Sequence, residues 1–211
     1  MLKNWFKIYI HNAIKNKWFT FLTIIGLAIG IAGVIFSTLY WKDETSYDQW
    51  NPDKDRIYET LSVFPIAGEE WPTSVEPLPR YLKEKSDKVE NYCWFEGWYG
   101  KETFYVDQKK VYIEGIVSTD QNFFDFIPFK FIKGNVNDFR KNKYGIALEE
   151  SEAIKIFGNE NPVGKILTNY DGRKMPIYGV FKGNKFSGFQ PKIVISNIYT
   201  RFDDIKDNWG A

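Results

Sequence analysis

Residues 18–41 read WFTFLTIIGLAIGIAGVIFSTLYW, an apolar run of 24 residues without a charged side chain. A helix rises about 1.5 Å per residue, so this run would extend roughly 36 Å and could cross a hydrocarbon core of about 30 Å with some tilt. Its polar members, Thr20, Thr23, Ser37 and Thr38, carry hydroxyls that can bond back to the helix. We therefore predict a transmembrane helix over residues 18–41.

Aromatic and basic side chains flank this run, as they flank the interfaces of membrane helices. We assign five residues to the predicted membrane interface: Trp18, Tyr40, Trp41, Lys15 and Lys17. A buried core helix is one alternative, but a segment of this length without a charge is unusual in so small a domain. A cleaved signal peptide is the other alternative, although its apolar core would have about 7–15 residues.

The flanking charges predict the orientation. Residues 1–17 contain four lysines and no acid, whereas the other flank opens with Lys42, Asp43, Glu44 and Asp48. Because basic residues favour the cytoplasmic side, we expect the N-terminus in the cytoplasm and residues 42–211 outside.

Residues 1–17 also have a pattern of their own. Apolar side chains recur at helical spacing, with the lysines off that stripe, which predicts an amphipathic helix on the inner leaflet. A disordered basic anchor is the alternative. The stripe consists of Leu2, Trp5, Phe6, Tyr9, Ile10 and Ala13.

Small residues are interleaved within the predicted span. Gly26 and Gly30 are four residues apart, Gly33 follows, and Ala28 and Ala32 repeat the same spacing. Such spacing allows close approach of helices in lipid, so we predict packing against other helices of this chain or of a partner.

Residues 42–211 carry a net charge of −3, which gives no basic surface for nucleic acid. The single histidine, His11, lies in the predicted cytoplasmic arm, so the outer segment has no imidazole. One cysteine, Cys93, excludes an internal disulfide framework and a cysteine-rich zinc site; we expect it to be a buried, small apolar residue.

The outer segment mixes helix and strand signals and predicts an α+β fold, without the regular repeat of a doubly wound sheet. We expect a strand over residues 89–98, a hairpin of 103–107 with 110–117 around Gln108–Lys109, and a turn followed by a buried edge strand over residues 123–132. A helix over residues 149–157 would place Ala153, Ile154 and Phe157 on one face and end at Gly158. Asp171–Gly172 predicts a second hairpin. The remaining expected elements are a helix over residues 75–85 and strands at 146–148 and 193–195.

Motifs that would carry chemistry are incomplete. Residues 158–165, GNENPVGK, have five residues between the glycines where a phosphate loop needs four, and Pro162 removes a backbone N–H. Asp53 and Asp55 resemble the start of a calcium loop, but Tyr58 stands where glycine is required. The adjacent acids Glu69/Glu70, Glu149/Glu150 and Asp203/Asp204 would point apart. We therefore predict no catalytic residue, no cofactor and no metal.

Three stretches together resemble the MacB-like, or FtsX-like, permeases of ATP-binding cassette (ABC) transporters, in the two-halved form found in Bacteroidetes-type bacteria. The first is LKNWFKIYIHNAIKNKWFTFL at residues 2–22, which runs into IIGLAIGIA at 24–32. The second is SYDQWNPDKDRIY at 46–58. The third is IALEESEAIKIFGNENPVGKIL at 146–167.

The resemblance implies a division into a cytoplasmic arm (1–17), a membrane helix (18–41) and a MacB-like periplasmic core domain (42–211) in the bacterial inner membrane. It implies a non-catalytic subunit that couples ATP hydrolysis by an ABC ATPase subunit to periplasmic work, such as export of antibiotics, peptides or lipoproteins. The other implied partners are a second permease half or copy, a periplasmic adaptor and the lipid bilayer. Arg56 and Tyr58 would be structural couplers.

Such permeases place further membrane helices after the periplasmic domain. Because the sequence stops at Ala211, inside what resembles the last third of the domain, we expect a truncated form. The alternative is a single-pass, membrane-anchored domain for extracytoplasmic binding or sensing.

Overall fold

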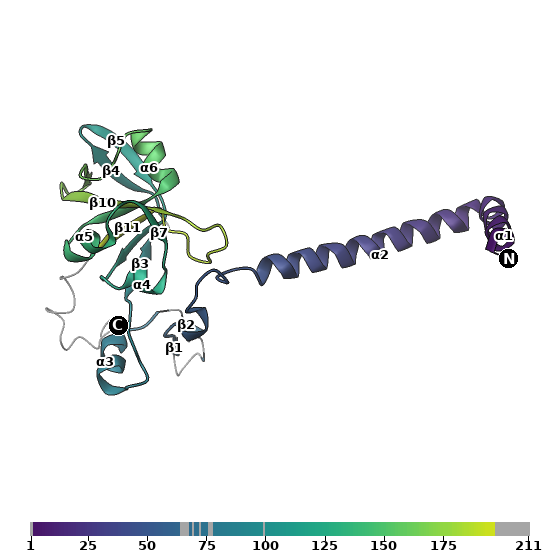
Figure 1. Cartoon of the computed structure of the whole chain (residues 1–211), viewed down its shortest axis with the longest axis horizontal. Helices are drawn as coiled ribbons and strands as arrows, with labels where there is room; N and C mark the ends of the chain where they lie inside the picture. The colour runs from purple at the N-terminus through teal and green to yellow at the C-terminus, as the bar shows by residue number, and fades with distance from the viewer. Residues whose placement is uncertain are drawn as a thin grey trace. The chain divides into compact units, whose positions relative to one another are not determined.

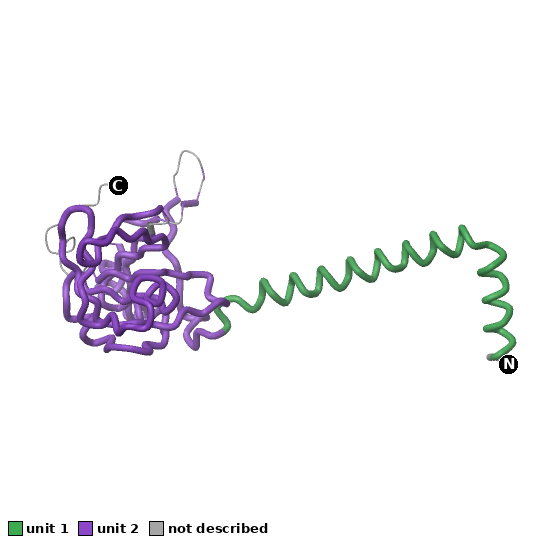
Figure 2. The backbone as a smooth tube through the Cα atoms, turned by 90° about the horizontal axis from the view of Figure 1, so that it is seen from above, with its two compact units in different colours: residues 1–49 green, residues 50–211 purple. Residues whose placement is uncertain are grey.

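The computed structural model describes residues 2–63, 68, 70–71, 73–75, 78–98 and 100–196. The chain divides into two compact units, residues 1–49 and residues 50–211 (Figure 2). Each unit is a separate body with its own local structure.

The first unit consists of two helices, α1 (Leu2–Lys15) and α2 (Lys17–Glu44). Asn16, between them, has the non-helical dihedral angles φ −109° and ψ 50°. The Thr20 hydroxyl donates to the Ala13 carbonyl at 3.2 Å, which ties the start of α2 to α1. Helix α2 has no buried residue, and it is the one helix among the described residues long and apolar enough to span a membrane.

Two of the four side chains predicted to bond back to the helix do so within α2, whereas Thr20 bonds to Ala13 of α1. Thr23 donates to the Phe19 carbonyl at 2.9 Å, and Thr38 donates to the Val34 carbonyl at 2.8 Å. These bonds leave the lateral surface of the helix apolar, which is what a lipid environment requires.

The second unit has an α+β fold built on a nine-stranded mixed sheet, which confirms the predicted fold class (Figure 1). The strands lie in the order β3-β6-β11-β8-β10-β9-β4-β5, and β7 pairs with β10 outside this path. The pairs β10–β8 and β11–β6 are parallel, and the other pairs are antiparallel. The sheet strands are β3 (Phe95–Trp98), β4 (Glu102–Val106), β5 (Lys109–Ile113), β6 (Ile116–Thr119), β7 (Lys130–Gly134), β8 (Ile146–Glu149), β9 (Ile166–Asn169), β10 (Lys174–Lys182) and β11 (Ile193–Ser196).

Shorter elements complete the second unit, and α3, β1 and β2 lie beyond one end of the sheet (Figure 1). A two-stranded ladder precedes it in the chain, and helix α6 lies beside the β4–β5 hairpin (Figure 1). These elements are η1 (Lys54–Arg56), β1 (Ser62–Val63), β2 (Glu70–Trp71), α3 (Leu78–Lys85), α4 (Phe123–Phe126), α5 (Val136–Lys141) and α6 (Glu150–Phe157).

The sheet is buried on both faces, which explains why its central strands are continuous apolar runs. Ile146 and Leu148 of β8 pack into one core cluster, whereas Ala147 between them packs into the other. Ile193 and Val194 of β11 divide in the same way, because successive side chains of a strand point to opposite faces. The first cluster includes residues of α6, and the second includes residues of α4 and α5.

Strand β10 is the longest of the described strands and connects β7 and β8 to β9, β4 and β5. Its first residues pair with β9 and its last with β7, while β8 runs along its other side. Gly134, opposite Gly179 in this ladder, has φ +76°, and a Cβ at Gly134 would lie 2.0 Å from the Tyr178 carbonyl oxygen. Only glycine therefore fits this crossing of β7 and β10.

Several local expectations are confirmed. The hairpin at Asp171–Gly172 joins β9 and β10, with Gly172 at φ +79°. Helix α6 ends at Gly158, with φ +62°. Other expectations are wrong in detail: the first hairpin turns at Asp107–Gln108, and Gly115 at φ +70° divides the predicted strand 110–117 into β5 and β6.

Two further expectations need correction. Ile154 is 57% exposed, because the buried stripe of α6 consists of Glu152, Ala153 and Phe157. The predicted strand 89–98 begins only at Phe95, since the Trp94 amide donates to the Asp120 carboxylate at 2.9 Å rather than to a neighbouring strand.

Candidate functional site

The predicted membrane-interface residues lie at the two ends of α2. Lys15 ends α1, Lys17 begins α2, and Trp18 lies in the first turn of α2. Tyr40 and Trp41 lie in its last turns, and all three aromatic side chains are exposed. An apolar stretch with aromatic ends is the pattern of a membrane-spanning helix.

The small residues of α2 form two separate stripes. At about 100° per residue, Gly26, Gly30 and Gly33 share one side of the helix, whereas Ala28 and Ala32 lie on the opposite side. A Cβ added at any of the three glycines would meet nothing within 4 Å. Their role in helix packing therefore stays a prediction.

The second unit begins with two anchored residues that sequence reasoning missed. The Trp50 ring stacks on the Phe129 ring, with centroids 5.3 Å apart and an interplanar angle of 18°. Asn51 is buried, and its side-chain amide donates to the Phe126 carbonyl at 2.7 Å while its oxygen accepts from the Asp53 amide at 3.0 Å. The segment that follows α2 in the chain is thus bonded into the sheet unit.

Arg56 and Tyr58, the expected couplers, lie close by on the surface. Arg56 pairs with Glu90 and, at 3.3 Å, with Asp53. The Tyr58 side chain is 84% exposed, and its hydroxyl donates to the Asp55 carbonyl at 3.4 Å. Arg56 links η1 to the segment after α3. The contacts with the core of the second unit come from the partly buried Trp50 and the buried Asn51.

Cys93 lies in an environment that suppresses reactivity. Burial raises the pKa of its thiol, and the nearby Asp120 carboxylate raises it further. Burial also raises the pKa of Asp120, although its hydrogen bonds from the Trp94 and Asn122 amides oppose that shift. The Cys93 side chain is half-buried rather than fully buried as expected, and its raised pKa keeps the thiol neutral, which makes it a poor nucleophile.

The described residues contain no group of three His, Cys, Asp or Glu side chains that could hold a metal ion. Glu149 accepts from the Ser151 amide and caps α6, so it is committed to the helix terminus. Glu69, Asp203 and Asp204 lie outside the described residues.

The segment that resembles a phosphate loop is a structural turn. Gly164, at φ +88°, donates its amide to the Ile177 carbonyl at 2.8 Å, and the Ile177 amide donates to the Lys165 carbonyl at 2.9 Å. The Lys165 ammonium pairs with Glu160. These contacts dock the turn onto β10.

Comparison with known proteins agrees with the resemblance seen in the sequence. Residues 20–209 match the family of the MacB-like periplasmic core domain. No curated protein matches the chain. A solved domain assigned to a permease protein from Porphyromonas gingivalis has a TM-score of 0.57 at 19% identity and covers 67% of this chain, which supports the fold.

Two other solved structures are more distant. The extracellular domain of the noncanonic ABC-type transporter YknZ from Gram-positive bacteria has a TM-score of 0.44, 20% identity and 64% coverage of this chain. The periplasmic region of MacB from Actinobacillus actinomycetemcomitans has a TM-score of 0.44, 16% identity and 78% coverage. The chain spans 65% of the first of the three structures and 66% of each of the others.

Proposed function

This chain belongs to the MacB-like periplasmic core domain family of ABC transporter permeases, and from that premise we propose that it works as a membrane-anchored coupling subunit. It couples ATP hydrolysis by a separate ATPase subunit to work outside the membrane, such as export of antibiotics, peptides or lipoproteins. In this proposal the role of the chain is non-catalytic, and ATP hydrolysis belongs to the ATPase subunit.

One observation carries the proposal. Helix α2 ends at Glu44, and a few residues later Trp50 stacks on Phe129 and Asn51 donates to the Phe126 carbonyl. Only a few residues separate the end of α2 from a position that is bonded into the core of the second unit, and this short separation in the chain supports a coupling role.

The proposed placement is the bacterial inner membrane, with residues 1–17 cytoplasmic, residues 18–41 in the bilayer and residues 42–211 periplasmic. The four lysines before α2 support this orientation. The proposed partners are the ATPase on the cytoplasmic side, a second permease half or copy beside α2, and a periplasmic adaptor.

Purification of the tagged full-length chain from its native membranes in mild detergent tests the proposal. We expect an ATPase subunit to co-purify, with vanadate-sensitive ATP hydrolysis in the eluate. A chain that elutes without an ATPase, and without hydrolysis above the untagged control, would instead favour the single-pass binding or sensing domain.

A further inference from the structure

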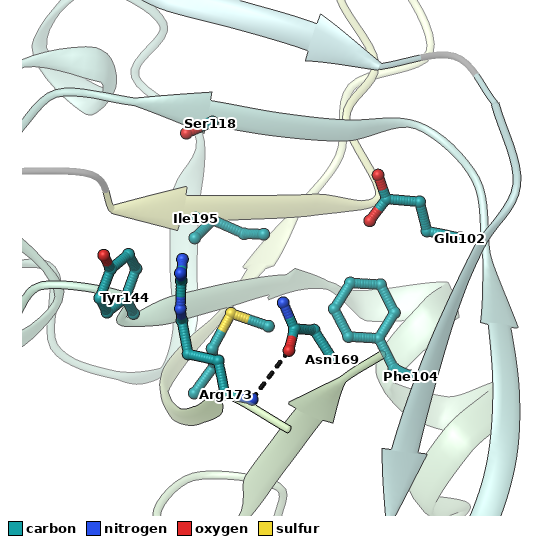
Figure 3. A pocket seen from close by; sticks show the side chains of 8 residues that line it. Glu102, Phe104, Ser118, Tyr144, Asn169, Arg173 and Ile195 are labelled. Carbon is teal, nitrogen blue, oxygen red and sulfur yellow. Dashed lines mark hydrogen bonds between the residues drawn. The ribbon is translucent and has the colours of Figure 1, made fainter. Parts of the chain in front are cut away.

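A hollow of about 340 Å³ opens on the curved sheet of the second unit (Figure 3). Glu102 and Phe104 of β4 line it together with Ser118 of β6, although four strands separate β4 from β6 in the sheet order. The curvature of the sheet therefore brings distant strands to one site. Phe104 and Met175 are buried and, with Ile195, form its apolar lining.

Arg173 lies at the exposed edge of the hollow, with its side chain stacked on an aromatic ring. Its guanidinium lies 4.3 Å from the centroid of the Tyr144 ring, and its backbone amide donates to the Asn169 side chain at 2.8 Å. Stacking on a ring leaves the N–H edges of a guanidinium free for a carboxylate.

Tyr144 is itself held in an unusual conformation. Its φ is +59°, a region that residues with side chains rarely adopt, and its amide donates to the Ser196 carbonyl at 2.7 Å. Such strain persists where the surroundings impose it, and it is common at ligand sites. Here it places the ring beneath the guanidinium.

Glu102 points into the hollow from the side opposite Tyr144 and Arg173 (Figure 3). Burial raises the pKa of Glu102, and the negative charge of Asp171 raises it further. Within the described part of the chain, neither Glu102 nor Arg173 forms an ion pair. One hollow thus presents an unneutralised carboxylate and an unneutralised guanidinium on opposite sides.

We propose that this hollow binds a small zwitterion, with its carboxylate on Arg173, its ammonium on Glu102 and an apolar body against the partly exposed Ile195. A hydrophobic amino acid or a dipeptide has this chemistry. A simple anion would leave Glu102 unpaired and repelled, and a simple cation would leave Arg173 unpaired. The volume lies at the lower end of small-molecule pockets, which suits a ligand of this size.

Calorimetric titration of the full-length chain in detergent tests the proposal, with leucine and the dipeptide Ala-Phe as probes. At least one probe should bind saturably. N-acetyl-Ala-Phe lacks the ammonium and Ala-Phe amide lacks the carboxylate, so each should bind at least tenfold more weakly than Ala-Phe if the dipeptide is the better ligand. For leucine the matching pair is N-acetyl-leucine and leucine amide.

Two variants assign the ends of the ligand. Glu102→Gln should lower the affinity for the better probe at least tenfold, so that this probe binds the variant no more tightly than its N-acetyl form does. Arg173→Gln should likewise abolish the difference in affinity between the probe and its amide. Glu114→Gln and Lys174→Gln, which change exposed charges nearby, are the matched controls and should bind as the unaltered chain does.

The proposal fails if neither probe binds, if the blocked forms bind equally well, or if the controls lose as much affinity as the test variants. Thermal unfolding of each variant checks that it is folded. Arg173 is an exposed turn residue, so its variant keeps the test valid if Glu102→Gln unfolds. The site stands independently of the proposed transporter function.

Discussion

The side-chain amide of Asn51 donates a hydrogen bond of 2.7 Å to the backbone carbonyl of Phe126, 75 residues further along the chain. The side-chain oxygen of Asn51 accepts from the Asp53 amide, so a single buried side chain satisfies two backbone groups. The start of the second unit is therefore held by specific polar contacts of Asn51 and by the stacking of Trp50 on Phe129.

Asn51→Ala should destabilise the second unit. It removes both bonds and leaves the Phe126 carbonyl without its side-chain partner, which we expect to lower the free energy of unfolding by about 1–3 kcal/mol. Urea unfolding of the full-length chain in detergent measures this. Asn159→Ala is the control, since Asn159 is exposed and its side chain has no hydrogen bond among the described residues. If the free energy of unfolding of Asn51→Ala equals that of Asn159→Ala, the predicted stabilising role of Asn51 is contradicted.

The parts of the fold that the sequence predicted have local causes. Helix α2 follows from an uncharged run, the β9–β10 hairpin from Asp171–Gly172, and the end of α6 from Gly158. Each signal involves residues adjacent in the chain, so its physical consequence does not depend on the remaining fold.

The parts that the sequence did not predict depend on distant contacts. The start of β3 is set by the Asp120 carboxylate, which takes the Trp94 amide away from strand pairing. The Asn51–Phe126 bond and the approach of Glu102 and Arg173 to one hollow likewise follow from sheet curvature and topology. No spacing in one sequence encodes such contacts.

Glu149→Gln should lower the free energy of unfolding at neutral pH and change how that free energy depends on pH in the acid range. Burial raises the pKa of Glu149, but hydrogen bonds from Ser151 and Lys192 outweigh burial and hold the pKa below its ordinary value of 4.5. The charged carboxylate therefore stabilises the fold above pH 4.5, and this contribution is lost as the pH falls through the lowered pKa. The glutamine of this variant would keep an oxygen that can accept from the Ser151 amide, so the cost at pH 7 comes from the lost charge facing Lys192 and the helix N-terminus and should be about 0.5–1 kcal/mol.

Thermal unfolding between pH 7 and pH 3 measures this contribution. The difference between the unaltered chain and Glu149→Gln should shrink as the pH falls below 4.5. Glu150→Gln is the control, because Glu150 is adjacent and forms no ion pair in the described region. If the difference in unfolding temperature between the unaltered chain and Glu149→Gln stays constant from pH 7 to pH 3, the charge of Glu149 does not contribute to it.

Replacement of the four lysines before α2 by asparagine should disturb the orientation of the chain. Without Lys3, Lys7, Lys15 and Lys17 the charge bias across the helix is lost. Protease added to spheroplasts should digest residues 42–211 of the unaltered chain and leave a severalfold larger protected fraction of the variant. The exposed lysines Lys130, Lys133, Lys182 and Lys185 provide a control with the same change in charge. Equal digestion of all three chains would show that these four lysines do not set the orientation.

Gly30→Leu should weaken assembly in the membrane and leave the second unit folded. Gly30 lies on the glycine stripe of α2, and a Cβ added there meets nothing within 4 Å, so the substitution should mainly disturb a partner helix. Co-purification with the ATPase and the second permease half measures assembly, and we expect a loss of severalfold or more. Urea unfolding should be unchanged.

Ala32→Leu tests the opposite stripe, and Thr38→Leu, which lies off both stripes, controls for added bulk. A loss confined to Gly30→Leu would assign a single contact to the glycine stripe, whereas losses for both would place α2 between two neighbouring helices. Lipid tails pack around an isolated helix equally well whether it carries the original residue or leucine. Unchanged co-purification for both Gly30→Leu and Ala32→Leu would therefore show that α2 is only an anchor.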